Sequence, residues 1–244
     1  NMLISQVTGG DGALTQGAPA ASGAACDDTD RTCNFVSRVL GSTEDVWSAQ
    51  FQQGRLPNYG RSPGAYADPK LVLFSGSVDT GCGTAGSDVG PFYCPADHQL
   101  YLDPTFYAVM AQRLQAPGDF AQAYVIAHEI GHHVQNLIGA TEAGPQESRN
   151  HHSVRVELQA DCFAGVWGKQ AQAAINVDQA DIQEALNAAH QIGDDTLQRN
   201  AQGYTTPDAY THGTSEQRMR WFQRGFQSGD ARQCDTMQGA YNAL

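Results

Sequence analysis

The chain has 244 residues and a hydrophobic content of 41%, which is enough for one domain with a substantial core. Its formal net charge is -12, with only 14 Lys and Arg against 26 Asp and Glu. We therefore expect no nucleic-acid partner and no attraction to an anionic membrane surface. No run of 18 apolar residues occurs, so we expect no direct insertion of this chain into a membrane.

The N-terminal part differs in composition from the rest. Residues 1–33 are rich in Gly, Ala, Ser and Thr, which predicts a flexible or disulfide-tied lead-in to a single domain over residues 34–244. The first residues lack the basic segment and the long apolar core of a signal peptide. We expect any export signal to lie upstream of Asn1.

Six cysteines without a Cys-x-x-Cys pair favour disulfides over a thiolate zinc site. Disulfides in turn predict an extracytoplasmic location, which is periplasmic, cell-surface or secreted. Several pairings are possible, and six buried free thiols are the alternative. The pairing with two short loops is the most natural: Cys26–Cys33, Cys82–Cys94 and Cys162–Cys234.

The first half of the domain predicts one helical region and a small sheet. The helical pattern begins at Asn34, breaks at Gly41 and restarts at Ser42, which is a candidate N-cap. A loop from Gly54 to Pro69 follows, and a glycine-dense loop surrounds Cys82. Strands are predicted at three places, the last two of which form a hairpin: Leu71–Phe74, Phe92–Cys94 and Gln99–Leu102.

The second half is predicted to be mainly helical. One helix begins at Asp103 and ends near Leu114, and the next has Asp119 as its capping residue and Gly139 as its stop. Further helices are predicted at His152–Ala174, at Asp178–Ile192 and after a capping box that starts at Thr214. A small sheet followed by a helical half defines an α+β fold.

The helix over 119–137 contains His128-Glu129-x-x-His132. His128 and His132 are one turn apart and project from the same face, so both imidazoles can hold one zinc ion. Glu129 then lies beside the open position of the metal. The alternative is a chance motif with solvated histidines on an amphipathic helix.

A catalytic zinc usually takes three protein ligands. A third histidine in the metzincin pattern is absent, because Gln135 and Ile138 occupy the relevant places. The pair His151-His152 remains possible, although it lies near a helix start. Glu157 is the strongest candidate, because it lies mid-helix on an apolar segment where an unpaired carboxylate is costly.

A second acidic residue supports Glu157 as a ligand, and one alternative remains. Asp161 lies one turn along the same face, where it can accept the second ring N–H of a metal-bound histidine. The alternative is that Glu157 forms a surface salt bridge with Arg155 or Arg149.

From about residue 42 to the end, the chain resembles the bacterial putative neutral zinc metallopeptidase family, and its Glu-x-x-x-Asp pattern resembles the gluzincins. The segments that carry the resemblance are Pro69–Phe74, Gly90–Pro95, Gly118–Gln122 with the His-Glu motif, Glu157–Cys162 and Thr211–Arg218. It implies a zincin-like fold, with a small antiparallel or mixed sheet packed on the active-site helix. Family members typically carry an N-terminal membrane-spanning anchor, which would lie upstream. The cysteine-bearing lead-in departs from the family pattern.

These features predict one Zn²⁺ per chain and hydrolysis of peptide bonds in a peptide or protein substrate. The zinc would lower the pKa of its bound water to about 7, and Glu129 would act as general base. His212 is our candidate oxyanion donor, with Tyr210 behind it; the alternative for His212 is loop packing. The resemblance also suggests that the substrate adds a strand at a sheet edge, at Gly90–Cys94 or its hairpin partner.

Other interpretations remain open. The first is a zincin-fold module for binding or assembly with weak catalysis, and the second is a structural protein that binds no metal. Structural roles are expected for the remaining histidines: His133 in the core or beside the site, His98 in a turn and His190 on a helix surface.

Overall fold

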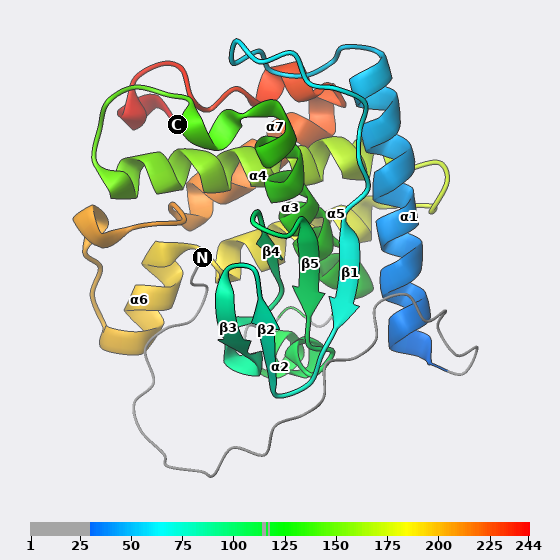
Figure 1. The fold of residues 1–244 in the computed structure, drawn as a ribbon. Helices are drawn as coiled ribbons and strands as arrows, with labels where there is room; N and C mark the ends of the chain where they lie inside the picture. The colour runs from blue at the N-terminus through cyan, green and yellow to red at the C-terminus, as the bar shows by residue number, and fades with distance from the viewer. Residues whose placement is uncertain (1–29, 114–115, 117) are drawn as a thin grey trace.

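A computed structural model describes residues 30–113, 116 and 118–244. Within this part the fold is α+β (Figure 1), as the element pattern predicts. The helices are α1 (Arg31–Gln52), α2 (Phe106–Arg113), α3 (Asp119–Ile138), α4 (Arg149–Ala171), α5 (Gln179–Gln191), α6 (Asp194–Gln202) and α7 (Ser215–Ser228). The strands are β1 (Lys70–Leu73), β2 (Ser77–Thr80), β3 (Gly83–Gly86), β4 (Phe92–Cys94) and β5 (Gln99–Leu102). Short 3-10 turns cover Ser87–Val89, Ala140–Glu142, Pro207–Ala209, Ala231–Cys234 and Tyr241–Ala243.

The main sheet is mixed and has the strand order β1-β5-β4. β5 pairs in parallel with β1 and antiparallel with β4, so the predicted hairpin of Phe92–Cys94 and Gln99–Leu102 is confirmed. The edge strand β4 packs against α3, which carries the His-Glu motif. The sheet therefore brings its free edge next to the candidate site.

The structure contains a second sheet that the sequence pattern does not predict. The glycine-dense segment around Cys82 forms an antiparallel hairpin of β2 and β3 rather than a loop. Its strands carry Ser, Thr, Gly and Ala and remain largely exposed, so they lack the alternation of apolar residues by which a strand is recognised. The disulfide Cys82–Cys94 ties this hairpin to β4, which confirms that pair.

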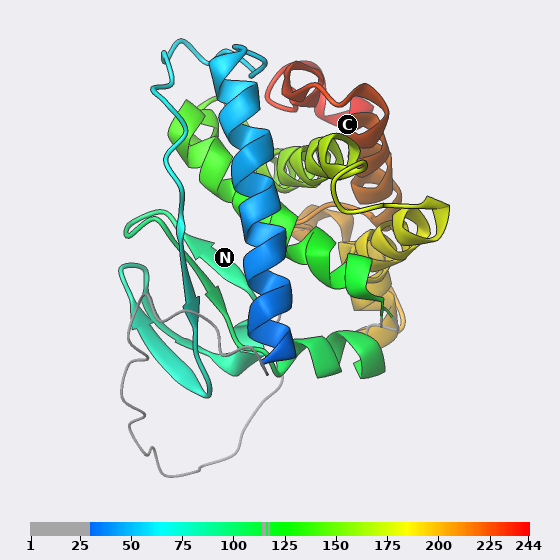
Figure 2. The same ribbon diagram turned by 90° about the vertical axis from the view of Figure 1, so that its right-hand side faces the viewer.

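The first helix is continuous, so the predicted break at Gly41 and the restart at Ser42 are wrong. Ser42 does not cap a helix: its hydroxyl donates to the Val39 carbonyl and accepts from the Trp167 indole. Apolar residues on both sides of Gly41, among them Val36 and Trp47, are fully buried. Packing against α3 and α4 therefore holds one helix through the glycine, and α1 lies along the outside of both (Figure 2).

The ends of α3 are set by glycines. Asp119 is the first helical residue rather than the cap, and Gly118 is the N-cap. Glu184 from α5 accepts the Phe120 N–H at 3.1 Å and supplies the negative charge that a helix N-terminus favours. At the other end Gly139 adopts φ 74°, as expected for a C-terminal stop.

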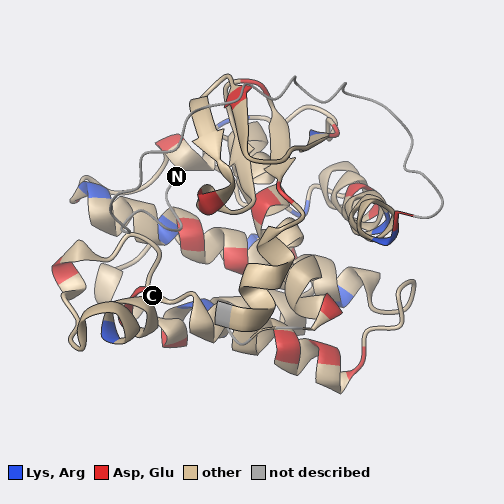
Figure 3. Cartoon of the chain, turned by 90° about the horizontal axis from the view of Figure 1, so that it is seen from below, with Lys and Arg blue, Asp and Glu red and all other residues tan. Residues whose placement is uncertain are grey.

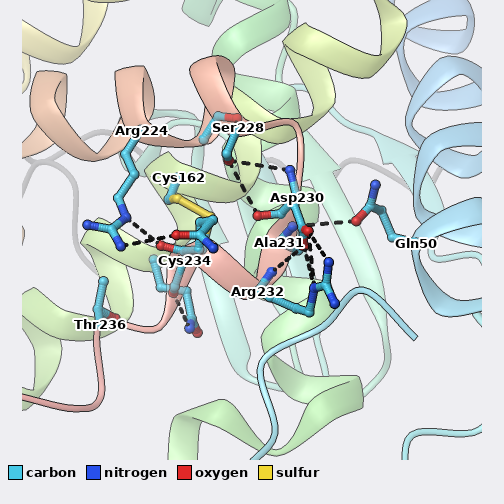
Figure 4. Close-up of a disulfide and its surroundings, with 12 residues drawn as sticks. Gln50, Cys162, Arg224, Ser228, Asp230, Ala231, Arg232, Cys234 and Thr236 are labelled. Atoms are coloured by element: carbon cyan, nitrogen blue, oxygen red, sulfur yellow. Dashed lines mark hydrogen bonds and ion pairs between the residues drawn. A yellow bond between two sulfur atoms is a disulfide. The ribbon is translucent and has the colours of Figure 1, made fainter. Parts of the chain in front are cut away.

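The helical half is built on the contact between α4 and α7. A Cβ on Gly165 would overlap the Phe222 carbonyl, and a Cβ on Gly225 would overlap that of Cys162, so the two backbones approach directly. The disulfide Cys162–Cys234, which was also predicted, fastens α4 to the turn that follows α7. Figure 4 shows this turn, whose Ala231 N–H donates to Gln50 of α1. The third predicted pair involves Cys26, which lies outside the described residues.

The remaining predictions shift by a few residues or miss an element. Capping boxes at Asp178 and Thr214 begin α5 and α7, and the Thr214 box is the predicted one. α4 begins after Ser148 and ends at Ala171, three residues earlier at each end than predicted. α2 begins at Phe106 rather than Asp103, and its predicted end at Leu114 lies outside the described residues. The sequence predicts no helix between 193 and 213, yet α6 is there, with Leu197 as its only large aliphatic residue.

Charged residues are distributed over many elements. Figure 3 shows the Asp and Glu positions spread over helices and loops, with Lys and Arg interspersed among them. Across the described ranges, no helix has the length and apolar character needed to span a bilayer. The largest buried side chains include Trp47, Trp167 and, unusually, Arg155 and Arg218.

Candidate metal centre

The sequence-predicted ligands meet at one point between α3 and α4. His128 Nε2 lies 3.2 Å from one carboxylate oxygen of Glu157, and His132 Nε2 lies 3.6 Å from the other. Among the described residues, these three form the one cluster of His, Cys, Asp or Glu whose ligand atoms lie within 4.8 Å of one another. The two imidazole rings are perpendicular, with centroids 4.8 Å apart.

This donor set fits zinc. Two ligands bound at about 2.0–2.1 Å to a tetrahedral ion lie about 3.3 Å apart, which is close to the two distances above. Two imidazole nitrogens and one carboxylate also form the ligand set of known zinc hydrolases. His128, His132 and Glu157 would therefore hold the ion. The side chain of His132 is 19% exposed, so the site is open on one side.

Close packing of α3 on α4 allows the ligands to meet. Gly131 lies between the histidines, and a Cβ there would be 3.0 Å from the Ala160 carbonyl oxygen. Ala160 lies between Glu157 and Asp161 on α4. Helices α3 and α4 thus touch at Gly131 and Ala160. The histidines on α3 and Glu157 on α4 lie beside this contact, which brings their side chains together.

Each ligand histidine has its second ring nitrogen occupied. His128 Nδ1 donates to Asp161 at 2.8 Å, because a carboxylate oxygen only accepts. His132 Nδ1 lies 2.8 Å from the Gln135 side-chain oxygen, and the Gln135 amide donates to the Val156 carbonyl. With both Nδ1 atoms donating, both Nε2 atoms face Glu157 and are the nitrogens available to a metal ion.

The buried charges around these ligands are strongly coupled. Burial raises the pKa of Asp161, but the Arg218 guanidinium and His128 outweigh it and hold this pKa below its usual value. Burial likewise raises the pKa of Glu157, yet the neighbouring histidines keep it well below its ordinary value. Burial lowers the pKa of His128, whereas Asp161 and Glu157 raise it to about 10. The two carboxylates therefore place negative charge around the His128 ring, which would favour a divalent cation.

Glu129 faces the cleft beside the ligands. It is only 4% exposed, and its carboxylate accepts the Tyr93 backbone N–H at 3.0 Å. The Tyr93 hydroxyl, in turn, is bonded to His133 and Asn136 of α3. Edge strand β4 is thereby tied to α3 through both the backbone and the side chain of one residue.

His212 also lines the cleft and lies in the loop before α7. One oxygen of Asp194 accepts the backbone N–H groups of Thr211, His212 and Gly213, at 2.8, 2.7 and 3.0 Å. The other oxygen lies 3.2 Å from His212 Nδ1, and the Thr211 hydroxyl lies 3.0 Å from the same nitrogen. No residue in the described part of the chain bonds to Nε2. Burial raises the pKa of Asp194, and the hydrogen bonds from His212 and these backbone groups bring it below the usual value.

The cleft has a volume of about 270 Å³. Four ionisable residues line the cleft, and we call them its floor: Glu129, His132, Glu157 and His212. We call the other lining residues its walls; they are small or apolar and belong to the β2–β3 hairpin, the segment before β4 and the first residue of β4: Thr80, Cys82, Gly83, Thr84, Ala85, Val89, Pro91 and Phe92.

The other sequence candidates lie elsewhere. Tyr210 is buried in the main core and is not among the residues that line the cleft. His151 stacks on Tyr241 and His152 bonds to the Thr141 carbonyl, so neither joins the cluster. Arg155 pairs with Glu147 rather than Glu157.

The remaining histidines lie where structural roles were expected. His133 is buried, bonds to the Ala67 carbonyl and has a pKa lowered by burial to about 4. His98 lies in a turn, and His190 is exposed on α5.

Sequence reasoning missed four residues that support the site: Gln135, Asp194, Arg218 and Tyr124. Gln135 follows His132 by three residues on the same helix face, which is a usable signal. Arg218 and Asp194 lie on other elements, and no periodicity connects them to the motif. Tyr124 lies four residues before His128 and donates to Asp161 at 2.5 Å.

A mixed α+β fold with two histidines and a glutamate on packed helices is characteristic of zinc metallopeptidases. The chain belongs to the family described as "Putative neutral zinc metallopeptidase", whose model matches residues 2–237. The uncharacterized protein YpfJ of Escherichia coli (strain K12) is 50% identical over 214 residues, 85% of this chain and 72% of that protein. The uncharacterized protein Mb2605 of Mycobacterium bovis is 46% identical over 221 residues, 85% of this chain and 71% of that protein. No solved structure gives a significant match.

Proposed function

We propose that the protein is a zinc-dependent endopeptidase that holds one Zn²⁺ through His128, His132 and Glu157. The observation that carries the proposal is the convergence of these three side chains at zinc-like separations, beside the glutamate of the motif. Membership in the metallopeptidase family supports the same class of reaction.

Zinc, when bound, would supply a Lewis acid and an acidified water. Glu129 would accept a proton from that water and pass it to the leaving amine. The Tyr93 N–H holds one Glu129 oxygen, which leaves the other to face the cleft. His212 would donate from Nε2 to the developing oxyanion in its doubly protonated form, with Nδ1–H donating to the Asp194 carboxylate.

The substrate would be an extended peptide lying along β4. This strand is at an end of the main sheet, and its residue Phe92 lines the cleft. Main-chain pairing with an edge strand recognises a peptide without regard to its sequence, and wall residues then select side chains. Away from the four residues of the floor, the walls carry no charged side chain.

We further propose an extracytoplasmic location. The disulfides Cys82–Cys94 and Cys162–Cys234 support it, because such bonds persist in oxidising compartments. An upstream membrane anchor, which the family resemblance implies, would place this domain at a membrane surface.

The test combines metal analysis with hydrolysis of a mixed peptide library. The wild-type protein should bind one zinc and cleave peptides, and Glu129→Gln should bind zinc but lose cleavage by about 10²-fold or more. His132→Ala and Glu157→Ala should lose the metal, whereas His98→Ala, at an exposed turn, should keep it.

The outcomes separate the alternatives. Equal cleavage by wild type and Glu129→Gln would remove Glu129 as the base. Bound zinc without cleavage by any variant would identify a binding module instead. A folded protein that takes up no zinc would overturn the proposal.

A further inference from the structure

Behind the metal centre lies a buried ion pair that the reaction does not use directly. Arg218 on α7 and Asp161 on α4 have fully buried side chains. The guanidinium binds the carboxylate through two nitrogens, Nε to Oδ2 at 2.8 Å and Nη2 to Oδ1 at 2.9 Å. Asp161 in turn accepts from His128, one of the proposed zinc ligands.

We propose that Arg218 is a positioning residue of the metal centre, which acts through Asp161 to fix the orientation and tautomer of His128. The inference rests on the proposed zinc site and adds a residue from a third helix to it. It assigns Arg218 no contact with substrate or metal.

The hydrogen bonds of Asp161 support this role. Its Oδ1 accepts from Tyr124, His128 and Arg218, and its Oδ2 has Arg218 as its one donor among the described residues. The bidentate fork fixes the plane of the carboxylate, because both oxygens must match the two guanidinium nitrogens. With the plane fixed, Oδ1 can meet His128 Nδ1 in only one direction.

The 3.5 Å approach of Arg218 Nη2 to His128 Nδ1 fits the same account. Both atoms carry hydrogens and share Asp161 Oδ1 as their acceptor, so this contact is not itself a hydrogen bond. His128 Nδ1 is therefore directed at Asp161, and Nε2 is directed toward Glu157.

Removing Arg218 would leave Asp161 buried and without its counter-charge. An uncompensated buried charge is strongly unfavourable, and the carboxylate would turn toward other donors or admit water. His128 would then lose its fixed partner. Loss of such outer partners of metal-bound histidines typically weakens metal binding by about 10- to 100-fold.

The fold shows how Arg218 reaches so far inward. Gly165 and Gly225 let α4 and α7 touch backbone to backbone, so an arginine in the first turn of α7 spans the distance to Asp161. His212 lies six residues earlier, in the loop that leads into α7. The segment 212–218 therefore supplies both His212, which lines the cleft, and Arg218, which lies behind His128.

The chain offers a matched control in Arg155, the other fully buried arginine of this region. It lies on α4, pairs with Glu147 and donates to the Thr236 and Gly239 carbonyls near the C-terminus. Its guanidinium therefore binds Glu147 and the C-terminal segment and does not contact Asp161. Replacing Arg155 should lower the stability of the fold without changing zinc affinity.

The experiment measures the dissociation constant for zinc, by competition with a chromophoric chelator, and the melting temperature of each variant. Arg218→Met should raise the zinc dissociation constant by about 10- to 100-fold. Arg218→Lys, which keeps the charge but not the fork, should give an intermediate increase. Arg155→Met should lower the melting temperature but change the dissociation constant by less than about twofold.

The outcomes are distinct. Wild-type protein without zinc would overturn the proposed function itself. Wild type that binds zinc, with Arg218→Met binding it equally well, would overturn the inference alone, as would an equal loss in Arg155→Met. If Arg218→Met does not fold, unchanged affinity in Arg218→Lys overturns the inference in its place.

Discussion

Asp194 is the main support of His212, whose Nδ1 also lies 3.0 Å from the Thr211 hydroxyl. Asp194 accepts three consecutive backbone N–H groups and faces His212 Nδ1, so it shapes the loop and orients the ring together. In Asp194→Asn, the side chain would keep its size but lose the negative charge that balances the doubly protonated ring of His212. We expect kcat/KM for peptide cleavage to fall by about 10- to 100-fold, with zinc content unchanged.

Asp195 provides the control for this prediction. It lies next to Asp194, but its carboxylate accepts from the backbone and hydroxyl of Ser215 rather than from His212. Asp195→Asn should lower the melting temperature and leave kcat/KM within about threefold of wild type. A similar loss of activity in both variants would mean that the loop, and not the ring of His212, was disturbed.

At the scale of single residues, helical spacing predicts those site residues that share a helix. His128 and His132 follow from helical spacing alone, and Glu157 and Asp161 follow because two acids one turn apart on an apolar helix need partners. Gln135, Asp194 and Arg218 do not follow, because their roles depend on which elements pack together. Tyr210 was predicted for the site because it is close to His212 in sequence, but packing places it away from the cleft.

Among the elements, the β2–β3 hairpin forms one wall of the cleft, and a disulfide holds it. Cys82 is exposed and lines the cleft, whereas Cys94 is fully buried in β4. Cys82→Ala/Cys94→Ala should free the hairpin, raise KM severalfold and leave the zinc dissociation constant unchanged. Loop-closure entropy predicts a loss of about 3 kcal/mol in the free energy of unfolding.

The second disulfide gives the opposite pattern. Cys162–Cys234 closes a longer loop, with a sequence separation of 72, and lies away from the cleft. Cys162→Ala/Cys234→Ala should lose about 4 kcal/mol of unfolding free energy but keep the wild-type KM. Urea denaturation and steady-state kinetics on both pairs test this. An unchanged KM in the hairpin variant would show that its wall does not contact substrate.

The contact of α4 with α7 leads to a prediction about glycine. Gly225→Ala forces backbone atoms of the two helices apart, because its Cβ would overlap the Cys162 carbonyl. We expect a loss of about 1–3 kcal/mol in unfolding free energy. Because the same contact brings Arg218 to Asp161, zinc affinity should fall as well.

Gly41 is the matched control, since it lies inside α1 and no atom lies within 4 Å of the position that a Cβ would take. Gly41→Ala should raise the unfolding free energy by up to about 1 kcal/mol, through helix propensity alone. Denaturant melts of the two variants should therefore shift in opposite directions. A stabilising effect of Gly225→Ala would contradict the close helix contact.

Elements with strong local signals were predicted, and elements that tertiary packing decides were not. α3, α5 and α7 have apolar periodicity with caps or stops at their ends. α1 passes through Gly41 because Trp47 and Val36 are buried on either side of it, and α6 forms with a single large aliphatic residue. In both cases neighbouring helices supply the stabilisation that the local sequence lacks.

At the scale of the whole molecule, the proposed metal ligands lie on helices that pack together through a common hydrophobic core. α3 and α4 are joined through Gln135 and Gln159, α4 and α7 through Arg218 and Asp161, and all three helices share the main hydrophobic core. Small metal-dependent domains, by contrast, unfold without their ion because they have little core. We therefore expect removal of zinc with a chelator to leave the far-ultraviolet circular dichroism unchanged.

Zinc should nevertheless stabilise the fold by mass action. Free zinc at 100 times its dissociation constant adds about 2.7 kcal/mol, which for a chain of this size raises the melting temperature by about 5–10 °C. His132→Ala should melt at the same temperature with and without zinc, since it lacks a ligand but keeps the core. Loss of helical signal on chelation would show instead that the ion organises α3 and α4. The hydrogen bonds of His128 and His132 would then form only after zinc binds, and would not orient the two rings beforehand.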